Sequence, residues 1–269
     1  MSRESFLPLR ATAFKGRSDA LAPAPSPEEG VPPRALGAAR ADEWLGGGLR
    51  GDGVHEIFAT ADDLPNALGF ATLLALSSQE ATGPEGGLLW LRRASKAVPY
   101  GSGLVALGLV PETITLVTLA DTRALLGAAL DVVRTGATRA VLIELIGRQP
   151  LLDLTATRRL VLAAAQTGTF VLIVRADAEP GLSAAHSRWQ VRSAPSTALD
   201  ADAPGAPVFN LTLLRQRGGR EGLNILLEWN RDTASFHEWG EQGDEAPLSG
   251  GVAALVPGAE RPAAQGRAA

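Results

Sequence analysis

Two continuous apolar runs constrain the fold of this chain more than any other feature of its sequence. They are Ala140–Leu145 (AVLIEL) and Thr169–Val174 (TFVLIV), both short and rich in aliphatic residues. A strand that is apolar on both faces is typical of a parallel sheet covered by helices on both sides. Between the runs, Asp153 or Thr155 can cap a helix that extends to Gln166. The three segments together predict a strand–helix–strand unit of a parallel sheet.

Strands and helices alternate over most of the chain. The predicted strands are Val54–Thr60, Gly87–Leu91, Ile114–Thr118, Ala140–Leu145, Thr169–Val174, Arg188–Arg192, Val208–Arg215 and Leu223–Trp229. The predicted helices are Asn66–Ala81, Thr122–Thr135 and the helix ending at Gln166, and Gly136 and Gly168 suit left-handed caps. From about Arg188 strands follow one another directly, and Gln216–Gly222 (QRGGREG) indicates a hairpin turn. This order predicts an α/β fold with a mainly parallel sheet flanked by helices and a C-terminal antiparallel hairpin extension.

The two ends of the chain differ in composition from its middle. Residues 1–35 contain six prolines and few large apolar side chains after Phe14, which predicts a flexible proline-rich arm. Residues 240–269 are rich in Gly, Ala and Pro and contain no aromatic residue, which predicts a disordered tail. The folded domain is therefore expected at residues 36–239.

Composition excludes several classes of site. The sequence contains no cysteine, which rules out disulfides, thiolate metal ligands and a cysteine nucleophile. The histidines, His55, His186 and His237, lie far apart in the sequence, which argues against a histidine-rich metal centre. A net charge of −4 argues against a strongly basic nucleic-acid clamp. Because no uncharged apolar run reaches the roughly 18 residues of a membrane span, we expect a soluble cytoplasmic protein.

The predicted strand, loop and helix between residues 54 and 81 form the setting in which a phosphate-binding loop would be expected. That loop requires G-x-x-x-x-G-K-[ST], whose glycines let backbone N–H groups surround phosphate and whose lysine and hydroxyl hold charge and magnesium. The corresponding positions here are Ala59, Thr60, Ala61, Asp62, Asp63, Leu64, Pro65 and Asn66. The glycines and the lysine are absent, Pro65 lacks an N–H donor, and the two aspartates would repel phosphate. We expect no nucleotide cofactor, and we expect Asp62 or Asp63 to act as the N-cap of the helix.

Several segments of the chain resemble known proteins. The run Trp44–Phe58 (WLGGGLRGDGVHEIF) resembles the segment of the RecA core that leads into its nucleotide loop. Four further segments resemble the bacterial ImuA family, which consists of RecA-like accessory factors of DNA-damage-induced mutagenesis. These are Tyr100–Leu109 (YGSGLVALGL), Leu151–Leu160 (LLDLTATRRL), Ser183–Val191 (SAAHSRWQV) and Leu213–Trp229 (LLRQRGGREGLNILLEW).

The resemblance extends from about Leu36 to Trp229 and implies a RecA-like core without a functional phosphate loop. It also implies a non-catalytic adaptor in error-prone translesion synthesis during the SOS response. Family members act with ImuB, a catalytically inactive relative of Y-family polymerases, and with an error-prone polymerase of the DnaE type. RecA filaments are a further candidate partner. The implied location is the cytoplasm, with nucleoid association after DNA damage.

An alternative resemblance stays open. The SulA-type inhibitor is another RecA-related protein without a phosphate loop, and it blocks cell division by sequestering FtsZ. It shares the damage-induced setting of the ImuA family but differs in its target. Leu151–Leu160 and the long terminal segments favour the ImuA family. A further hypothesis is a homo-oligomer that forms through the proline-rich arm or through a sheet edge.

The remaining positions of a RecA active site also differ in this chain. Glu144 lies near the place of a magnesium-supporting acid, but without a phosphate loop a structural role is favoured. Arg92 and Arg93 lie where RecA carries a catalytic glutamate, and arginine cannot act as a general base. Arg175 occupies the place of a sensing glutamine. The resemblance therefore implies a RecA-like fold without catalytic chemistry.

Paired arginines are the candidate contacts for a partner or for DNA. They are Arg158, Arg159, Arg215, Arg217 and Arg220. Each can touch phosphate or an acidic protein surface, although a solvated position is the simpler explanation for each pair alone, including Arg92 and Arg93. RecA carries its DNA-binding loops where this chain has the short, non-basic segments 146–150 and 176–186. Any DNA contact is therefore expected to be weak or indirect.

Four of the five tryptophans fall into two groups. Trp44, Trp189 and Trp229 are expected to pack in the core or in the hairpin. Trp239, at the edge of the folded part, is the aromatic residue expected to meet a partner. One hypothesis places ImuB binding on the C-terminal strands and the acidic segment that follows Trp239.

Overall fold

The computed structural model describes residues 31–77, 87–94, 99–203 and 205–240. The chain divides into two units, Met1–Trp239 and Gly240–Ala269, and every element named below belongs to the first unit. Residues 1–30 and 241–269, most of the predicted arm and tail, lie outside the described residues. Arg34 is described, and its backbone forms an antiparallel bridge with Leu49, so ordered contacts begin within the predicted arm.

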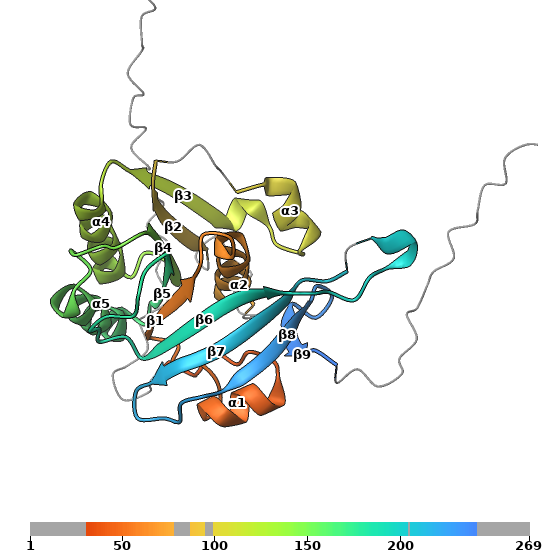
Figure 1. Cartoon of the computed structure of the whole chain (residues 1–269). Helices are drawn as coiled ribbons and strands as arrows, with labels where there is room; N and C mark the ends of the chain where they lie inside the picture. The colour runs from red at the N-terminus through yellow and green to blue at the C-terminus, as the bar shows by residue number, and fades with distance from the viewer. Residues whose placement is uncertain (1–30, 78–86, 95–98, 204, 241–269) are drawn as a thin grey trace, which may run out of the picture. The chain divides into compact units, whose positions relative to one another are not determined.

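One sheet of nine strands organises the described part of the first unit, in the order β3-β2-β4-β5-β1-β6-β7-β8-β9 (Figure 1). Its strands are β1 (Val54–Ala59), β2 (Leu88–Arg93), β3 (Ile114–Leu119), β4 (Ala140–Ile146), β5 (Phe170–Ala176), β6 (Ser187–Ala194), β7 (Val208–Gln216), β8 (Asn224–Asn230) and β9 (Ser235–Glu238). Neighbours from β3 to β6 are parallel, and β6 to β9 are antiparallel. The predicted α/β class, the mainly parallel sheet and the C-terminal antiparallel extension are confirmed.

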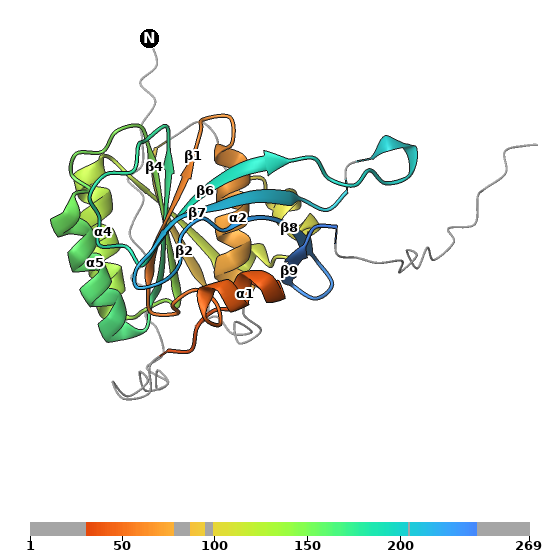
Figure 2. The same cartoon turned by 60° about the horizontal axis from the view of Figure 1, so that its bottom comes forward.

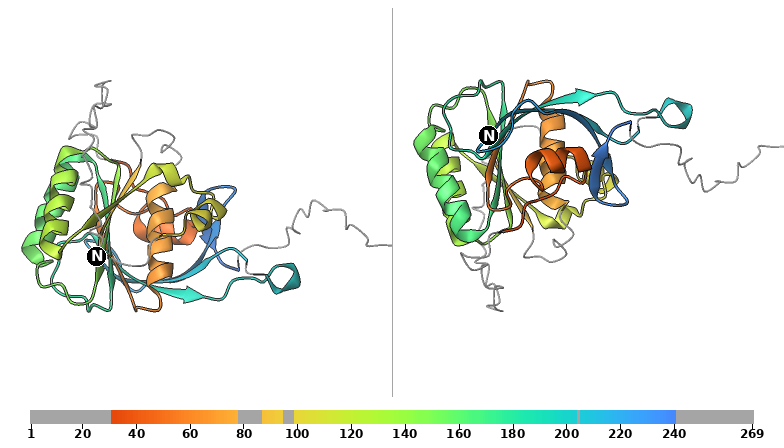
Figure 3. Two further views of the ribbon diagram at one scale, coloured as in Figure 1. Left: turned by 90° about the horizontal axis from the view of Figure 1, so that it is seen from above. Right: turned by 90° about the horizontal axis from the view of Figure 1, so that it is seen from below.

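Helices cover both faces of the parallel strands, as Figures 2 and 3 show. The α-helices of the described part are α1 (Ala39–Leu45), α2 (Leu64–Leu76), α3 (Gly101–Ala106), α4 (Thr122–Thr135) and α5 (Leu154–Thr167). Buried residues of α1 and α2 share one core with the sheet, and those of α4 and α5 share a second core on its other face. None of the helices in the described ranges is long and apolar enough to span a membrane.

The continuous apolar runs are explained by this two-sided burial. In β5, Phe170, Leu172 and Val174 belong to the core that contains α2. Val171 and Ile173 point the other way, into the core that contains α4 and α5. A strand between two helical layers has no face for polar side chains, so alternation disappears from its sequence.

Local capping chemistry fixes the ends of α4 and α5. The Asp121 carboxylate accepts a hydrogen bond from the Ala124 N–H at 2.8 Å, and Asp153 accepts one from Ala156 at 2.7 Å. Asp153, of the two residues considered, is thus the N-cap of α5. Gly136 and Gly168 close the two helices in the left-handed conformation, as predicted.

Short elements were absent from the prediction. Helix α1 has seven residues and strand β9 has four, too few to show a hydrophobic period. The approach to α1 is held by the Asp42 carboxylate, which accepts hydrogen bonds from the N–H groups of Leu36 and Gly37. Helix α2 begins at Leu64, two residues before the predicted start.

An aromatic cluster joins α2 to the antiparallel strands. Phe70 of α2 lies 5.5 Å from Phe209 and 5.3 Å from Phe236, between ring centroids. Trp229 lies 4.9 Å from Phe236 and donates its indole N–H to the Leu107 carbonyl. Trp229 is buried here, and Trp189 is buried in the same core, so the expected core packing of these two tryptophans is confirmed.

His55 is a buried histidine that the fold holds neutral. Its Nδ1 lies 2.7 Å from Ser187 Oγ, and its Nε2 lies 3.0 Å from the Arg50 carbonyl oxygen. Because a carbonyl only accepts, Nε2 carries the proton and Ser187 donates to Nδ1. Complete burial lowers the pKa of His55 from 6.5 to about 4. The ring therefore acts as a structural link between β1 and β6.

This burial predicts a loss of stability in weak acid. The unfolded chain binds a proton at His55 below pH 6.5 and the folded chain only near pH 4, so the folded state is progressively destabilised between these values. At its full extent, the lowered pKa of His55 reduces the free energy of unfolding by about 3 kcal/mol. Urea unfolding at a series of pH values should show a steeper fall for the wild type than for His55→Gln. If stability falls equally steeply with pH in the two proteins, the lowered pKa of His55 is contradicted.

Candidate functional site

The loop between β1 and α2, where a phosphate loop would lie, is closed by its own side chains. Thr60 Oγ1 donates to Asp63 Oδ2 at 2.9 Å, and the Asp63 N–H donates back to Thr60 Oγ1 at 3.2 Å. Asp63 Oδ1 accepts from both the backbone N–H and the hydroxyl of Ser193, each at 2.8 Å. The Ser193 N–H holds the pKa of Asp63 below its usual value, so the carboxylate is ionised at neutral pH.

These contacts correct the expected capping function. Asp63 occupies the N-cap position of α2, but its side chain makes no hydrogen bond to the helix. Its carboxylate is directed to β6 instead, where it binds Ser193. Asp62, the other expected cap, is exposed in the same turn. The helix start relies on Pro65, which lies within its first two positions and needs no hydrogen-bond partner for an N–H.

A second carboxylate occupies a backbone donor of the same loop. The Ala61 N–H donates to Asp177 Oδ1 at 2.8 Å. Asp177 follows β5 in the left-handed conformation, with φ at 50°, and its own N–H donates to the Ala59 carbonyl. A donor of the kind that a phosphate loop would present to its ligand is therefore bound by the chain's own carboxylate.

A buried ion pair lies at the carboxyl ends of β2 and β4. Glu144 accepts from the Trp90 indole N–H at 2.9 Å and from Arg92 at 3.2 Å. Burial raises the pKa of Glu144, while Arg92 and Trp90 act in the opposite direction. Arg92 is only 7% exposed, so the expectation of a solvated position is wrong for Arg92, although Arg93 is exposed. Glu144 has the structural environment that was favoured for it.

A second buried carboxylate, Glu56 in β1, holds two arginines on the opposite face of the sheet. Arg175 Nη1 lies 3.3 Å from Oε1 of Glu56, and Arg188 Nε lies 3.0 Å from Oε2. The Arg175 guanidinium also lies over the Phe58 ring, 5.2 Å from its centroid. Arg188 donates further to the Gly181 carbonyl. Sequence reasoning did not single out Glu56, because nothing local distinguishes a buried glutamate inside an apolar strand.

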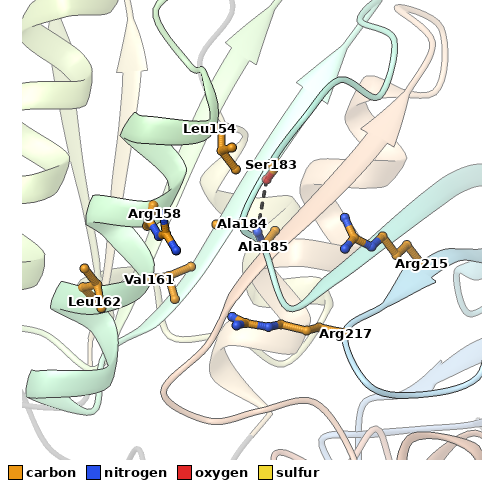
Figure 4. A pocket seen from close by; sticks show the side chains of 9 residues that line it. All are labelled: Leu154, Arg158, Val161, Leu162, Ser183, Ala184, Ala185, Arg215 and Arg217. Atoms are coloured by element: carbon orange, nitrogen blue, oxygen red, sulfur yellow. Dashed lines mark hydrogen bonds between the residues drawn. The ribbon is translucent and has the colours of Figure 1, made fainter.

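An arginine pocket opens between α5, the segment that leads into β6, and the end of β7 (Figure 4). Its volume is about 380 Å³. It is lined by Leu154, Arg158, Val161, Leu162, Ser183, Ala184, Ala185, Arg215 and Arg217. Three of the six candidate contact residues, from segments far apart in the sequence, therefore meet at one place.

The other candidates lie elsewhere. Arg159 is exposed on α5 but does not line the arginine pocket. Arg220 lies over the Trp44 ring, 5.5 Å from its centroid. Trp239 follows the edge strand β9, is 38% exposed, and binds the Leu226 carbonyl through its backbone N–H. Trp239, the aromatic residue expected to meet a partner, does not line the arginine pocket.

Partly exposed leucines accompany the arginines. Leu154 and Leu162 line the arginine pocket although they are 43% and 59% exposed, and Leu182, beside Ser183 in the chain, is 82% exposed. Sequence reasoning missed these leucines. Leu154, Arg158 and Leu162 are four residues apart on one helix and therefore share a face. That spacing is the signal that could have found them.

This combination of groups suits an anion that carries apolar neighbours. A guanidinium binds carboxylate or phosphate through two parallel hydrogen bonds, which lysine cannot do. Arg158, Arg215 and Arg217 form no side-chain ion pair or hydrogen bond with any residue of the described ranges. The arginine pocket is thus equipped for binding, and among its lining residues only Ser183 carries a hydroxyl, which accepts from the Ala185 N–H.

No protein-family model matches the sequence, and no curated protein matches it significantly. The resemblance to the ImuA family therefore stays a prediction from the quoted segments. The closed loop and the arginine pocket are independent observations, since both follow from the contacts within this chain.

The Asp63 contacts predict a measurable difference between two adjacent aspartates. Asp63→Ala removes the acceptor for Ser193 and Thr60 and should lower the free energy of unfolding by about 1–2 kcal/mol. Asp62→Ala is the matched control, because the exposed Asp62 side chain forms no hydrogen bond with a described residue. Its effect should stay within about 0.5 kcal/mol in urea unfolding. Equal losses for both variants would show that the contacts to β6 do not stabilise the loop.

Proposed function

We propose that this protein is a non-catalytic adaptor with a RecA-like core, acting in error-prone translesion synthesis during the SOS response. The observation that carries the proposal is the closed β1–α2 loop. Asp63 and Asp177 place two carboxylates at the loop and bind its backbone or the adjoining strand. These groups oppose the approach of a phosphate, because like charges repel and a donor is already taken. A core with this loop suits protein binding better than nucleotide chemistry.

The observed sheet supports the RecA-like part of the proposal. The resemblance implies mainly parallel strands between helices, followed by an antiparallel extension, and the fold has this arrangement. Glu144, which the resemblance puts near the place of the magnesium-supporting acid, is engaged by Arg92 and Trp90. An acid bound in this way is not free to position a metal–nucleotide complex.

The adaptor function would join the partners that the resemblance names. These are an ImuB-type protein, an error-prone DnaE-type polymerase and, as a further candidate, RecA. The arginine pocket with its exposed leucines is the surface of the described part that best fits such binding. Any DNA contact through these arginines would be secondary, since they border an apolar pocket rather than a continuous basic groove.

A nucleotide-binding experiment tests the non-catalytic part of the proposal. A fluorescent ATP analogue with Mg²⁺ should show no saturable binding to the full chain in fluorescence anisotropy, because the Ala61 N–H is occupied and two carboxylates lie at the loop. RecA itself serves as the positive control. Saturable binding that unlabelled ATP displaces would contradict the proposal and point to an ATPase.

A genetic experiment tests the cellular function. In a clean deletion strain, ultraviolet-induced mutation frequency should fall to the uninduced level while damage-induced cell filamentation stays normal. The complemented strain is the control. Normal mutagenesis with lost filamentation would favour the SulA-type alternative, and no change in either would reject both functions.

A further inference from the structure

Three arginine side chains without a carboxylate partner among the described residues converge on one apolar pocket. We propose that the arginine pocket binds a short segment of a partner protein in which acidic residues stand next to large apolar ones. The inference deepens the adaptor function and rests on it, because an adaptor must hold its partners through defined surfaces. Nothing in the closed loop supplies such a surface.

The charge of the arginine pocket calls for carboxylates. Figure 4 shows Arg158 on α5 on one side and Arg215 and Arg217 on the other. Arg215 lies opposite Arg188 in the β6–β7 pairing, and Arg188 shares the single Glu56 carboxylate with Arg175. No acidic residue lines the arginine pocket, although the whole chain carries a net charge of −4. A carboxylate that enters would therefore meet unopposed guanidinium groups.

The apolar lining decides between protein and nucleic acid. Leu154, Val161 and Leu162 contribute aliphatic surface between the arginines. A sugar–phosphate backbone offers the arginines an anion but leaves this aliphatic surface uncovered, and nucleic-acid contacts are dominated by polar groups. A peptide with leucine or phenylalanine beside an acid would cover both surfaces at once. The observations therefore favour a peptide.

The frame of the arginine pocket is fixed before any partner arrives. Thr157 of α5 accepts a hydrogen bond from the Ala184 N–H at 3.1 Å, which ties the helix to the segment before β6. The Arg217 N–H donates to the His186 carbonyl at 2.7 Å, which ties the end of β7 to the same segment. Only the exposed side chains remain to be ordered on binding, and this lowers the entropic cost of binding.

A labelled peptide tests the proposal directly. The probe is a fluorescein-labelled peptide of alternating aspartate and leucine, measured by anisotropy with the full chain. Two reference probes accompany it, the same peptide with asparagine for aspartate and a labelled oligothymidylate. The wild type should bind the acidic peptide saturably, and Arg158→Gln/Arg217→Gln should weaken this binding about tenfold.

Matched variants distinguish peptide binding in the arginine pocket from a general attraction between surface arginines and an acidic peptide. Arg159→Gln and Arg220→Gln remove neighbouring exposed arginines that do not line the arginine pocket, and they should bind the acidic peptide as the wild type does. Leu162→Ser leaves the charge unchanged and should weaken peptide binding. The proposal is wrong if the acidic peptide does not bind, if the asparagine peptide binds equally well, or if all arginine variants behave alike. Tighter binding of oligothymidylate through Arg158 and Arg217 would also overturn it.

Complementation distinguishes this proposal from the proposed function. The deletion strain carrying Arg158→Gln/Arg217→Gln should remain deficient in induced mutagenesis, whereas the strain carrying Arg159→Gln should recover it. If the double variant restores mutagenesis fully, the adaptor function stands and the arginine pocket is not its binding surface. If the deletion itself leaves mutagenesis unchanged, the adaptor function fails, and the peptide measurement alone decides whether the arginine pocket binds acidic segments.

Discussion

The central strands β4 and β5 are buried on both faces, apart from Ile146 at the end of β4, and the need to cover both of their sides shapes the rest of the structure. Helices α1 and α2 supply one cover, and α4 and α5 supply the other. Inside such a sheet a charge must be accompanied by its counter-charge, because an isolated buried ion is far too costly. Glu144 is accordingly paired with Arg92, and the single Glu56 carboxylate is shared by Arg175 and Arg188, each of which keeps a small exposed fraction. Burial on both faces thus explains the apolar sequences of these strands and also the pairing of the charged residues among them.

Features encoded by neighbouring residues could be predicted from the sequence. The cap at Asp153, the left-handed glycines and the hairpin after β7 depend only on residues a few positions apart. The burial of Arg92 could not be predicted, because it depends on Glu144, 52 residues away, while Arg93 looks the same locally and is exposed. Asp63 was expected to cap a helix because aspartate is a common N-cap residue. Its carboxylate instead accepts hydrogen bonds from Ser193, which is distant in sequence. Of the candidate contacts, the chain alone could not show that Arg158 meets Arg215 and Arg217.

The described structure keeps its two notable regions apart. The closed loop and the Glu144 ion pair lie at the carboxyl ends of the parallel strands, where α/β proteins usually bind their ligands. The arginine pocket is lined instead by α5 and the end of β7, away from that location. A fold of this class permits such relocation, since binding sites depend on surface side chains rather than on the architecture beneath them. The proposed adaptor function uses this freedom, because it needs a surface for a partner and no reaction centre.

Asp177 is held in a left-handed conformation that costs a residue with a side chain about 1 kcal/mol or more. Its hydrogen bonds to Ala61 and Ala59 hold it there, so conformation and contacts support each other. The loop contributes only main-chain groups to these bonds, the Ala61 N–H and the Ala59 carbonyl, so a glycine at either loop position would keep both of them. The closure of the loop therefore depends on a side chain that follows β5, a strand more than a hundred residues further along the chain.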